Sequence, residues 1–146
     1  MTVSICCLTY NHEKYIRQCL DGLIMQKTEF DFEILVHDDA SSDATQSIIN
    51  EYVVAYPNLI KPILQIRNQY SQGISPLRQI LFPLVKGKYV ALCEGDDYWT
   101  DPLKLQKQVD FLENHPDYSL CCHMVRRINQ QDDFLKNLLA FVTSTD

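Results

Sequence analysis

The chain has 146 residues, of which 46% are hydrophobic and 22% charged, a size and balance typical of one globular domain. Its net charge of −6 disfavours a nucleic-acid-binding surface, which normally needs a basic face. No stretch approaches the roughly 20 apolar residues of a membrane span. Residues 1–8 are too short and uncharged for a signal peptide. We therefore expect a soluble, cytoplasmic protein that binds no nucleic acid.

The cysteine spacing argues against a zinc site or a disulfide framework. No CxxC motif occurs. Cys6 and Cys7, and likewise Cys121 and Cys122, are adjacent residues inside apolar runs. We expect all of the cysteines to be buried, reduced thiols. They are Cys6, Cys7, Cys19, Cys93, Cys121 and Cys122.

The first half of the chain alternates apolar runs, typical of buried strands, with apolar residues at helical spacing. Asn11 and either Ser41 or Ser42 are suited to cap two helices, and Pro57 ends the second of them. The predicted elements are, in chain order, a strand at 3–8, a helix that includes 16–24, a strand at 32–36, a helix between the serines and Pro57, and a strand at 63–66.

The second half repeats the alternation. Ser75-Pro76 and Asp101-Pro102 each pair a capping side chain with a proline suited to the first helical position. The predicted elements are a helix from 75 to about 84, a strand at 88–93, a helix from 101 to near 116, and a strand at 119–125. This order predicts an α/β, Rossmann-like fold with a mostly parallel sheet and helices on both faces. The apolar stretch 134–142 has little chain left to bury it.

Polar side chains follow three of the predicted strands directly, at 9–11, 38–39 and 94–97. Ligands of open α/β sheets bind at the carboxyl ends of strands, so neighbouring strands would bring these segments to one crevice. Clustered carboxylates need a positive partner there. Mg²⁺ or Mn²⁺ prefers oxygen ligands and shares its shell with substrate phosphates. The pattern therefore predicts a nucleotide diphosphate held through a divalent cation.

Glycine-rich phosphate-binding motifs are absent from the chain, which has only four glycines. No glycine follows the first strand, so the dinucleotide fingerprint is missing, and there is no GxxxxGK[ST] loop. The pyrophosphate must then be neutralised by the metal and by basic side chains. Arg67, Arg78 and Lys88 are candidates, and Arg78 is the best placed of them, on the helix before the acidic strand.

Three segments resemble the family 2 glycosyltransferases in order and spacing: SICCLTYN at 4–11, EILVHDDASSD at 33–43 and GKYVALCEGDDYWTDPL at 87–103. The resemblance implies the GT-A fold. It also implies inverting transfer of a sugar from a nucleotide-diphosphate donor, with a UDP-sugar favoured, to a glycan or lipid-linked acceptor. The EGDDYW-x-DP-x-KL variant is similar to bacterial enzymes that build surface polysaccharides.

The resemblance also implies roles for single residues. The segment 94–97 stands where the family has its DxD motif, with Glu94 in place of the usual aspartate. The implied roles are Thr9, Tyr10 and Asn11 bordering the nucleobase and ribose; Asp39, with Asp38 as a second candidate, bonding the base; Arg78 lining the donor site; Glu94 contacting the ribose or supporting the metal ligand; Asp96 binding the metal; and Asp97 contacting the donor sugar.

An inverting transfer needs a general base that deprotonates the acceptor hydroxyl. The resemblance implies such a carboxylate further along the chain, and neither Asp132 nor Asp133 matches its motif. We therefore expect residues 1–146 to form a single GT-A-type donor-binding domain, truncated before the acceptor-binding segment and inactive alone. The missing regions would supply the acceptor site and any peripheral contact with the inner face of the membrane.

Each motif also has a simpler interpretation. Asp38 and Asp39 can cap the next helix, residues 94–97 can form a solvated loop, and His37 is suited to a structural hydrogen-bonding role. Three other functions stay open: a receiver-like, Mg²⁺-dependent phosphoacceptor domain, a nucleotidyltransferase, and a non-catalytic nucleotide-binding module. The receiver reading is disfavoured because the acidic pair follows the second strand and not the first.

Overall fold

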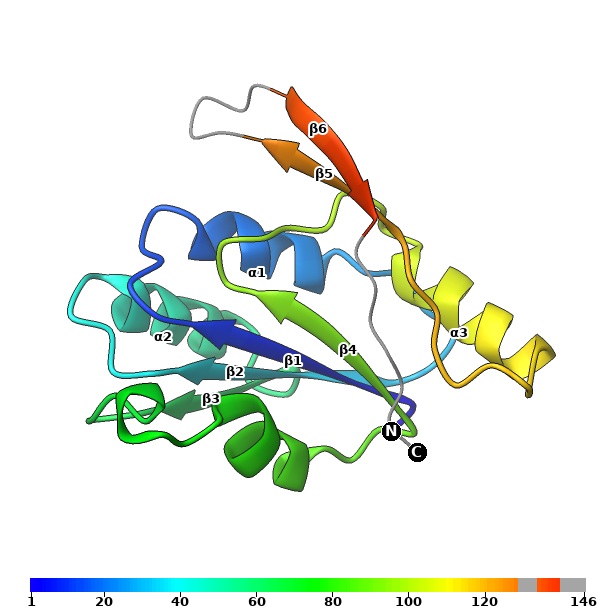
Figure 1. Cartoon of the computed structure of the whole chain (residues 1–146). Helices are drawn as coiled ribbons and strands as arrows, with labels where there is room; N and C mark the ends of the chain where they lie inside the picture. Colours follow the sequence, from blue (N-terminus) through cyan, green and yellow to red (C-terminus); the bar gives the residue numbers. More distant parts are fainter. Residues whose placement is uncertain (129–133, 140–146) are drawn as a thin grey trace. The chain divides into compact units, whose positions relative to one another are not determined.

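The computed structural model describes residues 1–128 and 134–139, in two compact units that comprise residues 1–104 and 105–146 (Figure 1). The first unit contains a four-stranded parallel sheet in the order β3-β2-β1-β4. Its strands are β1 (Val3–Thr9), β2 (Phe32–Asp38), β3 (Ile60–Leu64) and β4 (Tyr89–Glu94). The predicted α/β fold with a parallel sheet is confirmed.

Strand β1 lies between β2 and β4 and is hydrogen-bonded to both. Thr9 is the register partner of Asp38 on β2, and Leu8 is the partner of Glu94 on β4. Because all three strands run in the same direction, the segments that follow them leave from one edge of the sheet. Asp39 and Asp96 therefore come from strands that flank β1 at the same end, as the sequence predicts.

Helices cover both faces of this sheet (Figure 1). Successive strand residues point to opposite faces, and neighbouring cysteines of β1 show which helix covers which face. Cys6 packs in a cluster with Leu81 of the helix η2, while Cys7 contacts Cys19 of α1. The helical elements of the first unit are α1 (Ile16–Ile24), α2 (Thr45–Ala55), η1 (Tyr70–Gln72), η2 (Pro76–Leu81) and η3 (Phe82–Leu84).

Several element boundaries differ from the sequence prediction for local reasons. Strand β3 begins at Ile60, before Pro62, because an edge strand tolerates a residue without an N–H group. The predicted helix 75–84 begins as expected, with Ser75 as N-cap and Pro76 at its first position. It then forms a π-helical turn and a 3₁₀ turn that contains Pro83.

The predicted caps of the first two helices were wrong. α1 begins after Tyr15 and α2 after Ala44, and neither of these residues makes a side-chain capping bond. Asn11, Ser41 and Ser42 lie upstream of the helices, in the loops that leave the carboxyl edge of the sheet. Their hydrogen bonds join these two loops.

The second unit contains an antiparallel pair of strands, so the prediction of a fifth parallel strand at 119–125 was wrong. Its elements are α3 (Lys104–Asn114, beginning at the boundary of the units), β5 (Met124–Ile128) and β6 (Phe134–Leu139). A parallel partner needs a long crossover, whereas the short connection from β5 permits a hairpin with the apolar run that follows. Residues 140–142 of that run lie outside the described residues.

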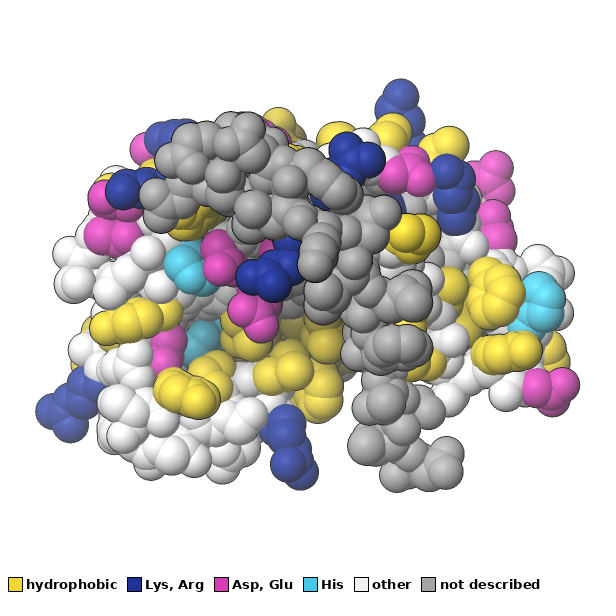
Figure 2. Space-filling model, turned by 45° about the horizontal axis from the view of Figure 1, so that its top comes forward, with side chains coloured by type: hydrophobic (Ala, Val, Ile, Leu, Met, Phe, Trp, Pro, Cys, Tyr) yellow, Lys and Arg dark blue, Asp and Glu magenta, His cyan; other side chains and the backbone are white. Residues whose placement is uncertain are grey.

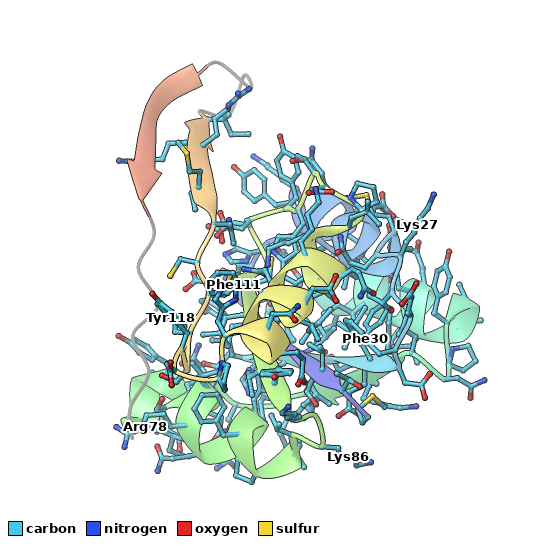
Figure 3. All side chains as sticks on the ribbon, turned by 90° about the vertical axis from the view of Figure 1, so that its right-hand side faces the viewer. Lys27, Phe30, Arg78, Lys86, Phe111 and Tyr118 are labelled. Carbon is cyan, nitrogen blue, oxygen red and sulfur yellow. The ribbon has the colours of Figure 1, made fainter. Side chains whose placement is uncertain are left out.

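Aromatic side chains cluster after the middle of α3 (Figure 3). Phe111 stacks on His115 with ring centroids 4.3 Å apart, and Tyr118 meets Phe111 edge-on at 5.6 Å. These contacts join the end of α3 to the turn that follows it. Among the described residues, no helix has both the length and the apolar character needed to cross a membrane.

A buried polar contact holds the amino edge of the main sheet. Ser4 Oγ donates to Glu33 Oε1 at 2.7 Å and accepts from the backbone N–H groups of Lys86 and Gly87 at 3.1 and 2.9 Å. The loop into β4 therefore approaches β1 closely. A Cβ on Gly87 would lie 2.6 Å from the carbonyl carbon of Val3, so this position has no room for a side chain.

We predict that Gly87→Ala lowers the free energy of unfolding by about 3 kcal/mol, because the new methyl group would collide with backbone and not with a movable side chain. Gly73→Ala is the matched control: nothing lies within 4 Å of its Cβ position, but its φ is 78°. The strain of that conformation costs about 1–2 kcal/mol. Urea denaturation of both variants measures the difference, and equal losses would contradict the packing argument.

Candidate functional site

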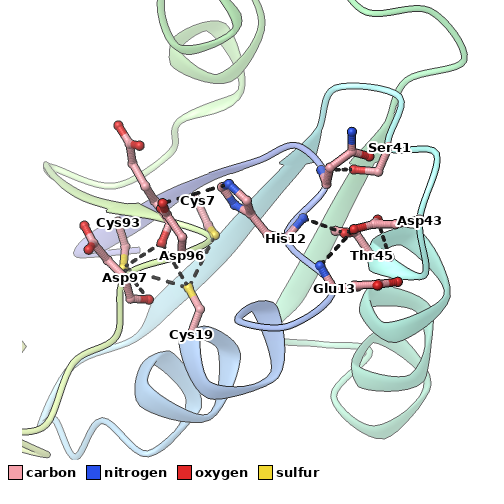
Figure 4. Close-up of polar contacts among 12 residues, drawn as sticks. Cys7, His12, Glu13, Cys19, Ser41, Asp43, Thr45, Cys93, Asp96 and Asp97 are labelled. Atoms are coloured by element: carbon pink, nitrogen blue, oxygen red, sulfur yellow. Dashed lines mark hydrogen bonds and ion pairs between the residues drawn. The ribbon is translucent and has the colours of Figure 1, made fainter. Parts of the chain in front are cut away.

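The loops after β1 and β2 are joined by side-chain to backbone hydrogen bonds (Figure 4). The Asn11 N–H donates to Ser41 Oγ at 2.8 Å, and Asn11 Oδ1 accepts from the Ser42 N–H at 2.8 Å. Asn11 has a φ of 55°, a left-handed conformation that asparagine tolerates better than most residues. Asn11, predicted to border the nucleotide, thus uses its side chain to shape the loop.

A second set of bonds extends this connection toward the start of α2. The Glu13 N–H donates to Asp43 Oδ2 at 3.1 Å, and Glu13 Oε2 accepts from the Ala44 N–H at 3.0 Å. The His12 N–H donates to Thr45 Oγ1 at 2.9 Å. Sequence reasoning missed these residues. Only the Asp43-x-Thr45 spacing before a helix carried a signal, as a capping pattern.

Asp38 is fully buried and shapes the turn after β2. Its carboxylate accepts from the backbone N–H of Ser41 at 2.9 Å, from the Ser41 hydroxyl, and from Gln46 Nε2 at 2.6 Å. Gln46 also donates to the carbonyl of Gln65 at 3.1 Å. These are the local contacts that the simpler interpretation of Asp38 predicts.

Asp39 is 5% exposed and anchors the segment that follows β3. Its Oδ1 accepts from the Gln69 N–H at 2.7 Å, and its Oδ2 accepts from the Tyr70 N–H at 3.0 Å. Asn68 Nδ2 donates to the Asp39 carbonyl at 3.2 Å. The carboxylate thus accepts hydrogen bonds from two backbone donors. Segment 68–72 is held at the carboxyl edge as a result.

The acidic turn 94–97 packs directly against the end of β1. The Gly95 N–H donates to the Leu8 carbonyl at 2.7 Å, and a Cβ at position 95 would lie 2.6 Å from Thr9 Oγ1. The glycine is therefore required by the close approach. Glu94, Asp96 and Asp97, the three acidic side chains of the turn, are all exposed.

Beyond the turn, the chain is anchored on α1. Trp99 is buried, and a Cβ on Gly22 would lie 2.7 Å from the Trp99 carbonyl oxygen. Gln26 Nε2 donates to the Asp101 carbonyl at 2.9 Å. The acidic turn is thus fixed at both ends, by β1 before it and by α1 after it.

Three thiols lie behind the acidic turn (Figure 4). Cys19 Sγ is 3.8 Å from Cys7 Sγ and 3.9 Å from Cys93 Sγ. Cys19 and Cys93 both donate to the Glu94 carbonyl, at 3.4 and 3.6 Å. The hydrogen bond with Cys7, together with burial, raises the pKa of Cys19, and the bond with Cys19 and burial raise that of Cys93. Cys19 and Cys93 therefore stay protonated and support the turn as weak donors.

Four of the six cysteines are buried free thiols as predicted, and the expectation for the other two was wrong. Cys121 is half-buried and Cys122 is exposed. Both precede β5, in the stretch that was expected to form a buried parallel strand. Because no strand forms at these residues, the two cysteines are not buried in a sheet.

The basic candidates lie in different places. Arg78 lines a recess of about 350 Å³ together with Ser75 and Gln79, at the start of η2. Figure 3 shows Arg78 and Lys86 at opposite ends of the η2–η3 segment. Lys88 precedes the first residue of β4, at the amino edge of the sheet, so its prediction as a phosphate ligand was wrong.

His37 is fully buried on β2, and neither of its ring nitrogens has a hydrogen-bond partner. The expected structural hydrogen-bonding role is therefore not observed. Burial lowers the pKa of His37, while the charges of Asp39 and Asp38 oppose that shift. The imidazole is thus held neutral in the folded protein.

Acidic side chains and histidines lie close together on the face shown in Figure 2. His12 Nε2 lies 4.0 Å from Asp96 Oδ2. Within the described residues, no group of three or more metal-binding side chains converges. An exposed carboxylate at this edge is nevertheless suited to a cation that takes its other ligands from substrate phosphates and water. Asp96 is such a carboxylate, and its role as a metal ligand stays a prediction.

The chain belongs to glycosyl transferase family 2, whose model matches residues 4–143. The resemblance predicted from the three sequence segments is confirmed. The parallel sheet and its covering helices form the fold of the GT-A glycosyltransferases, to which the structural neighbours belong.

Two relatives illustrate the range of the family. Protein Rv1520 of Mycobacterium tuberculosis is 50% identical over 126 residues, which cover 86% of this chain and 36% of the relative. The Escherichia coli enzyme WfaP, a UDP-Glc:α-D-GlcNAc-diphosphoundecaprenol β-1,3-glucosyltransferase, is 32% identical over 111 residues, 76% of this chain and 41% of WfaP. The chain thus spans well under half the length of these relatives.

Two solved structures resemble the chain. Staphylococcus aureus TarS in complex with UDP-GlcNAc has 31% identity and a TM-score of 0.66, over 80% of this chain and 32% of TarS. A mannosyltransferase from Pyrobaculum calidifontis, solved with GDP-Man and Mn²⁺, has 22% identity and a TM-score of 0.65, over 75% of this chain and 32% of that one. The second likeness concerns the fold alone.

We predict that His37→Leu makes stability less dependent on pH. The pKa of His37 is lowered on folding, so the unfolded chain binds a proton that the folded chain does not, and stability falls as pH drops below about 6.5. In the variant this slope falls by up to one proton, about 1.4 kcal/mol per pH unit. Urea titrations at pH 5, 6 and 7 measure the slope, and an unchanged slope would contradict the buried neutral state.

Proposed function

We propose that the protein takes part in inverting transfer of a sugar from a UDP-sugar to a glycan or lipid-linked acceptor in bacterial surface polysaccharide synthesis. Family membership supports the glycosyl transfer. TarS binds UDP-GlcNAc, and WfaP uses UDP-Glc with a lipid-linked acceptor. A lipid-linked acceptor would bring the protein to the cytoplasmic face of the membrane.

The observation that carries this proposal is the register of β1 with its two neighbours. It brings the loop 9–11, the turn after Asp38 and the acidic turn 94–97 to one edge of the sheet. Ligands of open α/β sheets bind at this edge. The nucleotide would lie over Thr9, Tyr10 and Asp39. Tyr10 is the exposed side chain of the three, at 46%, whereas Thr9 is buried.

The proposed metal ligand is Asp96, with Glu94 near the ribose, Asp97 near the donor sugar and Arg78 lining the donor site. The Mg²⁺ or Mn²⁺ ion would neutralise the diphosphate of the leaving nucleotide. The residues of this chain would bind and orient the donor. The acidic turn is fixed by β1 and α1, so its carboxylates are held in place for this role. The general base is not assigned: Asp132 and Asp133 lie outside the described residues.

We predict that UDP binds to residues 1–146 only with Mn²⁺ or Mg²⁺ present, and that Asp96→Asn weakens this binding at least about tenfold, or about 1.4 kcal/mol. The physical reason is loss of the negative oxygen ligand. Asp31→Asn is the matched control, since Asp31 is exposed just before β2, at the amino edge of the sheet. Isothermal titration of UDP with and without metal measures both.

Metal-independent UDP binding, or equal losses in the two variants, would contradict the proposal. Titration with GDP tests which nucleobase the site prefers. Tighter binding of GDP than of UDP would change the proposed nucleobase from uracil to guanine, and the proposal of a metal-dependent diphosphate site would stand. Stable labelling of Asp38 or Asp39 by acetyl phosphate would instead favour a phosphoacceptor domain.

A further inference from the structure

We propose that His12 is a second protein ligand of the donor-bound cation, an inference that rests on the proposed function. It would bind through Nε2 beside Asp96, with the Thr9 hydroxyl orienting the ring. Neither the sequence motifs nor the functions of the relatives assign a role to His12. The inference comes from two features of the carboxyl edge: the separation of His12 from Asp96, and a pair of buried polar atoms without partners.

The backbone of His12 is fixed from both sides. Its N–H donates to Thr45 Oγ1 at 2.9 Å, and its carbonyl accepts from the N–H groups of Tyr15 and Ile16 at 2.9 Å each. The ring also meets Tyr15 edge-on, with centroids 6.4 Å apart. His12 is thus presented by a rigid loop, a suitable support for a metal ligand.

The separation between His12 Nε2 and Asp96 Oδ2 is 4.0 Å. This is too long for a hydrogen bond, whose donor and acceptor lie about 2.7–3.2 Å apart. An ion between the two atoms, with bonds of about 2.1 Å to each, spans a gap of this size. The side chains are 23% and 48% exposed, so the gap is open to an ion and its remaining ligands.

Two buried polar atoms beside this gap lack hydrogen-bond partners: Thr9 Oγ1 and His12 Nδ1. Both lie within 3 Å of the point that a Cβ on Gly95 would occupy, at 2.6 and 2.9 Å. Buried polar atoms are nearly always paired, so this pair calls for an explanation. A hydrogen bond from His12 Nδ1–H to Thr9 Oγ1 would satisfy both atoms.

The same hydrogen bond selects the tautomer that metal binding needs. With the proton on Nδ1, the lone pair of Nε2 is free to bind a cation, and histidine ligands commonly donate their other N–H to an oxygen. Asp96 would supply one oxygen and His12 one nitrogen, leaving the remaining positions for phosphate oxygens and water. Because imidazole suits transition metals better than Mg²⁺, the site is expected to prefer Mn²⁺.

The direct test is pulsed EPR of the protein with Mn²⁺ and UDP. Electron spin-echo modulation from a bound ¹⁴N nucleus is expected in the wild type and is expected to disappear in His12→Gln. His115→Gln is the matched control, since His115 stacks on Phe111 in the second unit, and it is expected to keep the signal. This readout needs no catalytic turnover, and the wild-type spectrum is informative even if a variant folds poorly.

Affinity provides a second readout. His12→Gln is expected to weaken Mn²⁺ binding to the UDP complex about tenfold or more and Mg²⁺ binding about threefold or less. Thr9→Val is expected to weaken Mn²⁺ binding about tenfold. Thr9→Ser keeps the hydroxyl and is expected to bind Mn²⁺ as tightly as the wild type. Equal losses for the two metals in His12→Gln would indicate a phosphate contact and overturn the assignment.

The outcomes separate this inference from the proposed function. Binding of Mn²⁺ and UDP that depends on Asp96 but shows no nitrogen modulation overturns the role of His12 and leaves the donor site intact. Absence of any metal-dependent UDP binding overturns both. Nitrogen modulation that survives in His12→Gln and vanishes in His115→Gln would place the ligand in the second unit.

Discussion

The parallel pairing of β1 with a strand on each side is the constraint on which the site depends. The loop 9–11, the turn after Asp38 and the acidic turn 94–97 follow β1 and its two neighbours, and the register fixes how far each of these strands reaches. Asp39 donates its N–H to the Thr9 carbonyl at 3.0 Å, and Gly95 donates to the Leu8 carbonyl at 2.7 Å. Two consecutive carbonyls of β1 therefore set the positions of both acidic segments.

The acidic segments differ in what their charge does. Asp38 and Asp39 are buried and accept hydrogen bonds from backbone and side-chain donors, so their charge stabilises the loops. Residues 94–97 direct their carboxylates to solvent, while protonated thiols and a tryptophan support their backbone from behind. One edge thus combines carboxylates that build the framework with carboxylates available to a ligand.

Periodicity and strand-end logic predicted the four parallel strands and the edge at which polar residues gather, because both follow from local sequence. The carboxyl edge of β1, β2 and β4 was predicted from three short polar segments. The bonds from Asn11 to the serines, and the contact of His12 with the acidic turn, were not predicted, since they join residues about 30 or more apart. The hairpin of β5 and β6 was missed for a similar reason: an apolar run does not reveal the direction of its partner.

The two borders of the main sheet differ in their capacity for growth. On β3, Lys61 and Pro62 occupy consecutive positions, and charged residues and prolines are devices by which natural sheets prevent unwanted strand addition. On β4, within the part of the chain that the structure describes, β1 is the only neighbour, and Val90 and Leu92 are exposed. An additional strand, from this polypeptide or another, would therefore extend the sheet most readily alongside β4, the strand that leads into the acidic turn.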